Sequence, residues 1–525
     1  MIDYSPLKQK HNRKEYVARG IISALGVTIV GSVFPFIIRT VFMYTLGKEY
    51  LGLNSFYASV IQVLNLTELG IGSVMVYFLY DPISHGDYAK IGALLFQLKK
   101  IYIRIGIAVS MLGVSIMPFF TYLIKCDIPY GINIYFYYLL YLIPIVAQFL
   151  IFPEIIILLQ AYQRNDLTNL ITIITCMIMY IYQLVVIVVN KSYLLYMLGF
   201  FLYAVAIAVM RILYRNKLFV DIRIQGNLDR DEKIQIKKRI VSMIGHQIDE
   251  KMFNTIDNFF ISAHLGLGPL AIYGNYFLVL TLVIMLLEAV YSSLLPSMGN
   301  AIASESVSSN FTRFRCILCL SFLLATWASS CLMCLYNDFM FLWTGTASYD
   351  GVVILLFCTY FYLSQVRRTV QIFKNAKGLW WNDRLKPYVS ILLDFLLDLI
   401  LVPCIGIKGA LISSIICIAL VEIPWETKAL FDSYFEGYLK QYIIVAIKYM
   451  LRSLSVIVLA VGLFSLWRWN LSWGVLILKA LVCSVMTVVM LVFTFGKTEE
   501  YCIWKKTIIE MVRRIAGNIT VKRNG

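Results

Sequence analysis

The sequence predicts an all-α membrane protein with about fourteen transmembrane helices, and three observations support this fold class. Of the 525 residues, 60% are hydrophobic and 14% are charged, with a mean hydropathy of +0.77, whereas about a quarter of an average soluble domain is charged. Apolar runs of about 20 residues, long enough to cross roughly 30 Å of hydrocarbon, recur along the whole chain. The alternating segments of about ten residues that are typical of membrane β-barrels do not appear.

Fourteen apolar segments can be traced along the chain, and Pro and Gly interrupt several of them, as is common in membrane helices. Their approximate limits are 20–45, 51–80, 92–124, 131–160, 167–190, 193–215, 240–263, 269–300, 312–336, 349–375, 386–404, 408–432, 441–465 and 470–495. We expect a basic tail at 1–19, a first lobe of six helices at 20–215 and an inter-lobe loop at 216–239. A second lobe at 240–432, two further helices within 441–495 and a basic tail at 496–525 then follow.

The positive charges predict the orientation of these helices. If the N-terminus lies in the cytoplasm, 37 of the 46 Lys and Arg residues fall in cytoplasmic segments, 5 fall outside and 4 fall inside spans. Because cytoplasmic loops of membrane proteins are enriched in Lys and Arg, this asymmetry places both termini in the cytoplasm. It also accounts for the net charge of +16 without nucleic acid as a partner.

A short internal repeat supports the division into two lobes. LGKEYLGLNSFY begins at Leu46, and LGLGPLAIYGNY begins 219 positions later at Leu265. In both copies the segment joins an outgoing span to an incoming one, so the two copies share one orientation in the membrane. Parallel repeats of this kind are found in transporters.

Ionisable residues inside the expected spans are the strongest functional signal, because each costs several kcal/mol unless it faces protein, water or a partner. In the seventh span, His246, Glu250, Asn254 and Asp257 share one helical face, with Lys251 beside it. This face predicts the lining of a wet cavity; the alternative is that its charges only pair with one another between helices. The other such residues are Arg39, Glu68, Glu154, Asp249, Glu288, Asp394, Asp398 and Glu422.

Several of these residues allow two interpretations. Arg39 can extend its side chain to the outer surface or offer a fixed cation to an anionic substrate. Glu68 can form a helix–helix contact beside two small glycines. Asp394 and Asp398 lie one turn apart, so like-charge repulsion favours protonation of one of them. Arg367 and Arg368, near the inner half of the tenth span, can anchor that end of the helix.

No catalytic or metal site is expected. The two CxxC pairs, at Cys316 and Cys331, lie in one apolar segment about 22 Å apart if it is helical, too far for four thiolates to converge on zinc. FGKT at 495–498 lacks the earlier glycine of a P-loop. GxSxG and HExxH are absent, and we expect neither an enzyme nor a cofactor.

Four segments resemble the polysaccharide-biosynthesis branch of the multidrug/oligosaccharidyl-lipid/polysaccharide (MOP) exporter superfamily, which includes the Wzx-type flippases. The residues that carry the resemblance are LGKEYLGLNSFYASVIQVLNLTELGIGSVMVYFLYDPISHGD (Leu46–Asp87), LLQAYQRND (Leu158–Asp166), TIDNFFISAHLGLGPLAIYGNY (Thr255–Tyr276) and KPYVSILLDFLLDLILVPCIGIKGALISS (Lys386–Ser414). The resemblance implies two six-helix lobes arranged in a V, as in MATE transporters, followed by two C-terminal helices. Asp394 and Tyr162 depart from the residues that are usual in this family.

The resemblance also implies a function: moving an undecaprenyl-diphosphate-linked oligosaccharide across the bacterial cytoplasmic membrane by alternating access, for surface polysaccharide synthesis. A polymerase and glycosyltransferases of the same pathway are possible partners. A diphosphate needs fixed cations in a cavity of low dielectric constant. The candidate cations are Arg39, Lys251, Arg367 and Arg368. The candidates for ion coupling or for polar cavity lining are Glu68, Glu154, Glu250, Asn254, Asp257, Glu288, Asp394 and Asp398.

Other functions are compatible with a chain of this composition. A drug/cation antiporter of the same fold predicts an apolar, acidic cavity with few fixed cations. A membrane-embedded sugar polymerase needs an acid/base pair near a large outer loop, and a scaffold gives the intramembrane charges little purpose. The sugar, the pathway, the coupling ion (H⁺, Na⁺ or none) and the oligomeric state are left open by the sequence.

Overall fold

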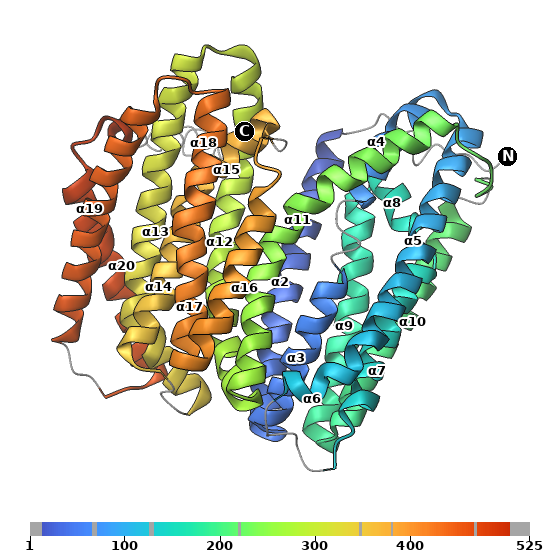
Figure 1. Ribbon diagram of the computed structural model, residues 1–525, viewed down its shortest axis with the longest axis horizontal. Coiled ribbons are helices and arrows are strands. Elements are labelled where there is room, and N and C mark those ends of the chain that lie inside the picture. Colours follow the sequence, from blue (N-terminus) through green and yellow to red (C-terminus); the bar gives the residue numbers. More distant parts are fainter. Residues whose placement is uncertain are drawn as a thin grey trace, which may run out of the picture. The chain divides into compact units, whose positions relative to one another are not determined.

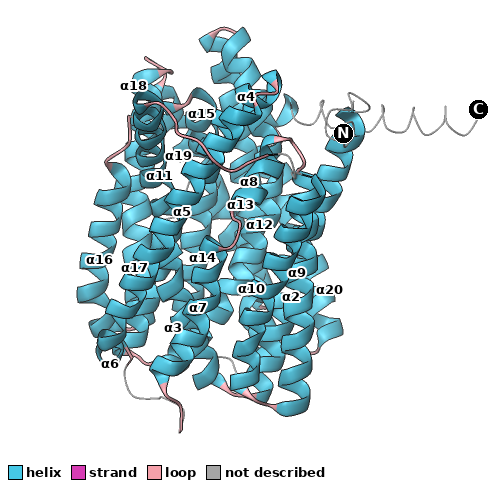
Figure 2. Ribbon diagram, turned by 90° about the vertical axis from the view of Figure 1, so that its right-hand side faces the viewer, coloured by secondary structure: helices cyan, strands magenta, loops and turns pink. Residues whose placement is uncertain are grey.

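The computed structural model describes residues 13–65, 71–124, 131–218, 222–345, 349–379, 382–466 and 470–503 (Figure 1). Side chains are described there except for 13–18, 20–22, 218, 241–254, 292, 293, 295–297, 300 and 303. Figure 2 shows helices joined by loops, with no strand in these ranges. The chain divides into two compact units, Met1–Asn275 and Tyr276–Gly525. The lobes and the loop at 216–239 that the sequence suggests stay a prediction.

The first unit holds the helices up to the start of α12. Its elements are α2 (Arg13–Thr45), α3 (Lys48–Leu64), α4 (Ile71–His85), α5 (Tyr88–Ile116), η2 (Met117–Phe119), α6 (Phe120–Leu123), α7 (Ile134–Leu150), α8 (Glu154–Ala161), α9 (Asn165–Asn190), α10 (Tyr193–Leu218), α11 (Arg230–His264) and the first turns of α12 (Leu267–Ser304). Helix α9 packs between α2 and α10. Its buried residues Ile171, Thr175, Met179 and Gln183 recur every four positions, so they form one face of the helix.

The second unit is built around one long central helix. Its elements are the rest of α12, then α13 (Val307–Thr344), α14 (Gly351–Val366), α15 (Arg368–Lys377), α16 (Lys386–Ile405), α17 (Ile407–Cys417), the π-helix η4 (Ile418–Glu422), α18 (Ile423–Ser433), α19 (Leu439–Ser465) and α20 (Trp473–Phe495). Helix α13 contacts α14, α15, α19 and α20. Its buried Ser321, Ala325, Ala328 and Ser329 are small side chains that let membrane helices approach closely.

Helices α16 and α17 form a tight hairpin that positions the buried charges of this unit. The turn uses Gly406 with φ of 64°, a conformation that glycine adopts without steric cost. The next turn brings Gly409 against the backbone of α16, and a Cβ there would lie 2.5 Å from the carbonyl oxygen of Leu401. The opposite side of α16 exposes apolar residues, such as Leu392 and Ile400, as expected of a surface that faces lipid.

The chain is a multi-pass membrane protein, but the expected count of fourteen spans is not confirmed. Within the described ranges, ten helices are long and apolar enough to cross a membrane, and the bent pair α7–α8 makes up to eleven. Two physical reasons explain most of the difference between the fourteen expected spans and the ten or eleven found. The sequence of α11 carries charges through its apolar part, and α14 ends after 16 residues at Val366.

Replacing Gly409 by Ala is expected to destabilise the second unit by about 1–3 kcal/mol, because the new methyl group must displace backbone of α16. Unfolding of the purified protein in detergent measures this loss. Gly462→Ala is the matched control, since Gly462 lies in α19 with open space around its Cβ position. It should leave stability unchanged or raise it by up to about 1 kcal/mol. Equal effects of the two substitutions would contradict the packing argument.

Candidate functional site

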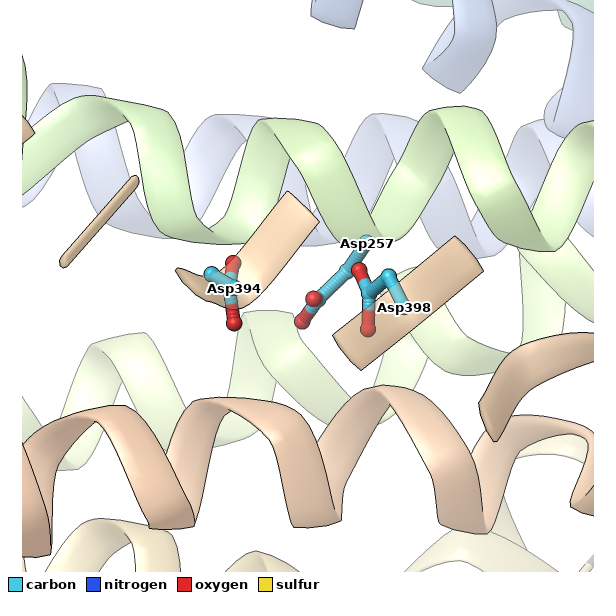
Figure 3. A group of neighbouring side chains, drawn as sticks. All are labelled: Asp257, Asp394 and Asp398. Carbon is cyan, nitrogen blue, oxygen red and sulfur yellow. The ribbon is translucent and has the colours of Figure 1, made fainter. Parts of the chain in front are cut away.

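A pair of carboxylates on α16 lies in the interior of the second unit. Asp394 and Asp398 are one helical turn apart, project from the same face (Figure 3), and are both 0% exposed. The hydroxyl of Ser413, on α17, donates a hydrogen bond to Oδ1 of Asp398. Neither carboxylate oxygen of Asp394 has a hydrogen-bond partner in the described part of the chain. Two ionised carboxylates buried one turn apart are strongly unfavourable, so this pair is suited to hold a proton or another cation.

A network of ion pairs lies at the end of α16 that begins with Lys386. Its centre is Glu426, which is 1% exposed. Oε1 of Glu426 lies 2.7 Å from Nζ of Lys386 and 3.7 Å from Nη2 of Arg367. Lys374 pairs with Asp383 and lies 3.9 Å from the same oxygen. With Glu422, which pairs with Arg367, the network contains three cations and three carboxylates. Its charges balance, and this makes their burial tolerable.

The two arginines of the tenth predicted span have different surroundings. Arg367 is enclosed by Glu422 and Glu426, which are each 1% exposed. Arg368 pairs with Glu288 at 3.0 Å, and the side chains of the two are 23% and 46% exposed. Arg367 is thus neutralised by protein groups, whereas Arg368 and Glu288 remain accessible. The use of either arginine for substrate binding stays a prediction.

Arg39, on α2, is held by three acceptors within the first unit. Its Nε donates to Oδ1 of Asn275, its Nη2 to the carbonyl oxygen of Ala271 at 3.1 Å, and its Nη1 to Oγ of Ser55 at 3.5 Å. The guanidinium group fits beside α12 because residue 274 is glycine: a Cβ at Gly274 would lie 2.5 Å from Nη2. Arg39 therefore connects α2 with α3 and the start of α12, and its use in substrate binding stays a prediction.

Asp257, on α11, is fully buried, and Figure 3 draws its side chain. Its Oδ2 accepts a hydrogen bond from the hydroxyl of Tyr273 at 2.5 Å. Its neighbour Asn258 donates from Nδ2 to Oγ of Ser59 on α3, at 2.9 Å. These two bonds fix the outer half of α11 against α12 and α3 of the same unit. The other members of the predicted polar face, Glu250, Lys251 and Asn254, lie in α11 at positions whose side chains are outside the described residues, and Glu68 is outside them altogether.

Glu154 begins α8, directly after the break that separates α8 from α7. It is 0% exposed, and no hydrogen-bond partner for either of its carboxylate oxygens lies in the described ranges. At the break, Phe152 has φ of 46°, which is uncommon for a residue other than glycine. From α10, Arg211 donates through Nη1 to the carbonyl oxygens of Gln148 and Ile151, at 2.8 and 2.7 Å. Arg211 thus satisfies the end of α7 that the break leaves open.

A cavity of about 140 Å³ lies beside this break. Tyr102, Gln148 and Arg211 supply polar groups to its lining, and the rest is mostly apolar. Asn65, at the end of α3, also lines it, and its buried Oδ1 has no hydrogen-bond partner among the described residues. The cavity has room for water or for one small ligand.

Outside the spans, two carboxylates are held by cations at the ends of helices. Arg313 hydrogen-bonds to Glu305, after α12, and lowers the pKa of that carboxyl group below its usual value. The Nζ of Lys408 lies 2.7 Å from Oδ2 of Asp350 and likewise lowers the pKa of Asp350, which caps α14. Both pairs are exposed, so they add little to stability.

Sequence reasoning missed part of this arrangement. No role for Arg211, Lys386 or Glu426 is predicted from the sequence. The signal for the network was available in part, because Lys386, Ser390, Asp394 and Asp398 recur every fourth residue. A spacing of four places all of them on one face of a helix. The hairpin turn at Gly406 decides which helix lies opposite this face. The spacing of residues along the sequence does not predict that helix.

No protein-family model matches the chain, and no curated protein matches it. Solved structures do. One is an inward closed conformation of the lipid II flippase MurJ, with 11% sequence identity over 91% of this chain and 99% of that one, at a TM-score of 0.62. A second is an inward-facing multidrug resistance MATE transporter of the MOP superfamily, with 12% identity, coverage of 80% and 99%, and a TM-score of 0.55. A third is a MATE transporter of Vibrio cholerae, with 14% identity, coverage of 80% and 99%, and a TM-score of 0.53.

The chain has the MOP transporter fold. The resemblance seen in the sequence is thereby confirmed at the level of the fold. In the second unit, the buried Lys386, Asp394 and Asp398 lie on α16, and Glu422 and Glu426 lie on η4 and α18, within segments that are long and apolar enough to cross a membrane. Lys374 and Asp383 of the ion network lie on α15 and in the loop that follows it.

In this MOP-fold chain, Arg39→Ala is expected to destabilise the first unit by about 1.5–3 kcal/mol, because a hydrogen-bonded charged group is lost and Asn275 keeps an unpaired buried oxygen. A double-mutant cycle with Asn275→Ala, read by unfolding in detergent, should give a coupling energy of similar size. Arg104→Ala removes an exposed arginine and should change stability by no more than about 0.5 kcal/mol. Additive effects of the two substitutions in the cycle would refute the bond.

Proposed function

We propose that this protein is a transporter that moves an undecaprenyl-diphosphate-linked oligosaccharide unit across the bacterial cytoplasmic membrane by alternating access, for surface polysaccharide synthesis. The observation that carries the proposal is the fold, together with the four segments that resemble polysaccharide flippases. The match to the lipid II flippase takes in 91% of the chain, whereas the two MATE matches named above take in 80%. A flippase therefore accounts for more of this chain than a drug transporter does.

The cations of the structure favour an anionic substrate group. Arg368 is the described arginine of the predicted set best placed to meet a diphosphate, because its side chain is 23% exposed and its partner Glu288 is more exposed still. Arg39 and Arg367 are occupied by protein acceptors and act by holding helices in place. A substrate diphosphate competes with Glu288 for Arg368. Arg368 then pairs with Glu288 in the empty transporter and with the diphosphate in the loaded one, and this change of partner can favour one conformation over the other.

Ion coupling is the second element of the proposal. The carboxylates of Asp394 and Asp398 are fully buried one turn apart, so both can be ionised together only at a high cost. Uptake of a proton removes this cost, and release restores it. An ion gradient can thus shift the equilibrium between two states of the transporter, provided that the states differ in their affinity for the ion.

The distribution of Lys and Arg favours a cytoplasmic position for both termini, and a polymerase and glycosyltransferases of the same pathway are the expected partners. A MATE-type drug/cation antiporter is the second candidate, because MATE structures share the fold and the buried acidic pair suits cation exchange. Drug efflux by the purified protein in vesicles would favour this alternative.

Deletion of the gene is expected to abolish the surface polysaccharide and to trap its lipid-linked unit in the inner leaflet. Leaflet-specific labelling of the sugar in spheroplasts measures both effects, and expression of the intact chain should reverse them. Normal exposure of the unit in the outer leaflet of a clean deletion strain would overturn the proposed function.

Asp394→Asn is expected to uncouple transport from the ion gradient, because the amide cannot take up or release a proton and keeps the shape of the carboxyl group. Transport in vesicles should fall by about tenfold or more when a gradient is imposed, and it should become insensitive to collapse of the gradient. Asp432→Asn, at an exposed position of α18, is the control and should behave as the parent protein does. Dependence on Na⁺ in place of H⁺ would identify the coupling ion as sodium.

A further inference from the structure

The buried side of α16 is a continuous polar stripe. Lys386, Ser390, Asp394 and Asp398 follow one another every fourth residue, and each is between 0% and 3% exposed. Because α16 is otherwise apolar and exposed on its other side, these four side chains form a single line through a helix that is long enough to span a membrane. Polar residues placed in this way require partners along their whole length.

The antiparallel segment opposite supplies these partners in matching order. Glu426 of α18 accepts from Nζ of Lys386 at 2.7 Å, and Oε1 of Glu422 accepts from the Ser390 hydroxyl at 3.2 Å. Further along, the Cys417 thiol donates to the carbonyl oxygen of Ser390 at 3.7 Å. Finally, Ser413 donates to Asp398. The contacts between α16 and the segment α17–η4–α18 thus run from the ion network to the acidic pair.

The π-helix η4 is what brings Glu422 into this line. Residues 418–422 are wound more widely than an α-helix, with Glu422 as the last of them, and such π-turns occur frequently at functional sites. Glu422 consequently lies between two different groups. Its Oε2 pairs with Arg367, while its Oε1 faces Ser390.

We propose that Ser390 and Glu422 form a proton relay that connects the Asp394/Asp398 pair to the ion network at the Lys386 end of α16. This inference rests on the proposed coupling role of that pair. A protonated Asp394 hands its proton to Oγ of Ser390, directly after a rotation of the side chains or through one water molecule. At the same time the original Ser390 proton passes to Oε1 of Glu422. Serine ends unchanged, Asp394 becomes ionised, and Glu422 becomes neutral.

The surroundings of each group fit this transfer. Ser390 and Arg367 face Glu422, so protonation of Glu422 weakens its ion pair with Arg367 and leaves the arginine to Glu426, whose Oε1 lies 3.7 Å from Nη2. Lys374, Lys386 and Gln371 also face Glu426 and keep it charged. Ser413 and Cys417 of α17 lie beside Asp394.

Burial decides that the relay carries a proton and not a hydrated cation. Ser390, Asp394 and Asp398 are 0% exposed and Glu422 is 1% exposed. A hydrated cation needs an open passage at least as wide as itself, whereas a proton moves along hydrogen-bonded groups without one. A serine hydroxyl can do this because it donates one hydrogen bond and accepts others at the same time.

The relay is tested by the rate at which the acidic pair changes protonation after a pH jump. Infrared spectroscopy of the full-length protein in liposomes follows the protonated-carboxyl band, and loss of this band in Asp394→Asn and Asp398→Asn assigns it to the pair. Ser390→Ala should slow the change by about tenfold or more with the same final amplitude. Ser390→Thr keeps the hydroxyl and should restore the rate.

Ser321→Ala is the matched control. Ser321 is also 0% exposed and shares a hydrogen bond with Oγ1 of Thr369 at 2.7 Å, on helices outside the stripe. Its substitution should leave the rate unchanged. Equal slowing by both alanine substitutions, or none by Ser390→Ala, would overturn the relay while the coupling role of the pair stands. A parent protein whose pair shows no change in the band between acid and alkaline pH would instead contradict proton coupling itself.

Discussion

The cost of an unpaired charge inside a membrane is the constraint on which this structure depends. Ionised side chains in spans cost several kcal/mol unless they pair with protein groups or face water, and this chain carries many ionisable residues in its expected spans. In the second unit Arg367, Lys374 and Lys386 are balanced by Asp383, Glu422 and Glu426. Helices α16 to α18 therefore need their hairpin arrangement, because removing any one partner would leave a buried charge uncompensated.

The acidic pair stands outside this balance. Asp394 and Asp398 have neutral neighbours in the described part of α17, Ser413 and Cys417, so nothing on that helix offsets two negative charges. Lys386 of α16 thus lies in the ion network, whereas Asp394 and Asp398 of the same helix lie beside neutral side chains of α17.

Arg39, unlike the acidic pair, is held by several hydrogen-bond acceptors of the protein. From the sequence it was an equal candidate for snorkelling and for binding an anion. The structure gives it acceptors from Ser55, Ala271 and Asn275, and Gly274 leaves the room that its guanidinium group occupies. Asn258 and Ser59 form a second polar link in the same unit. Both links join α2 or α3 to the segment 258–275, and the second copy of the short internal repeat begins within this segment, at Leu265.

The sequence by itself determined the all-α membrane class, the resemblance to MOP exporters and the one-turn spacing of Asp394 and Asp398, because hydrophobic length and a spacing of four residues are local properties. Tertiary structure decided the rest. It ended α14 at Val366, bent the chain between α7 and α8, and gave Arg211 the open carbonyl groups there. It also placed Glu426 opposite Lys386, forty residues away. Partners so distant in the chain are fixed by how helices pack, and no local pattern encodes them.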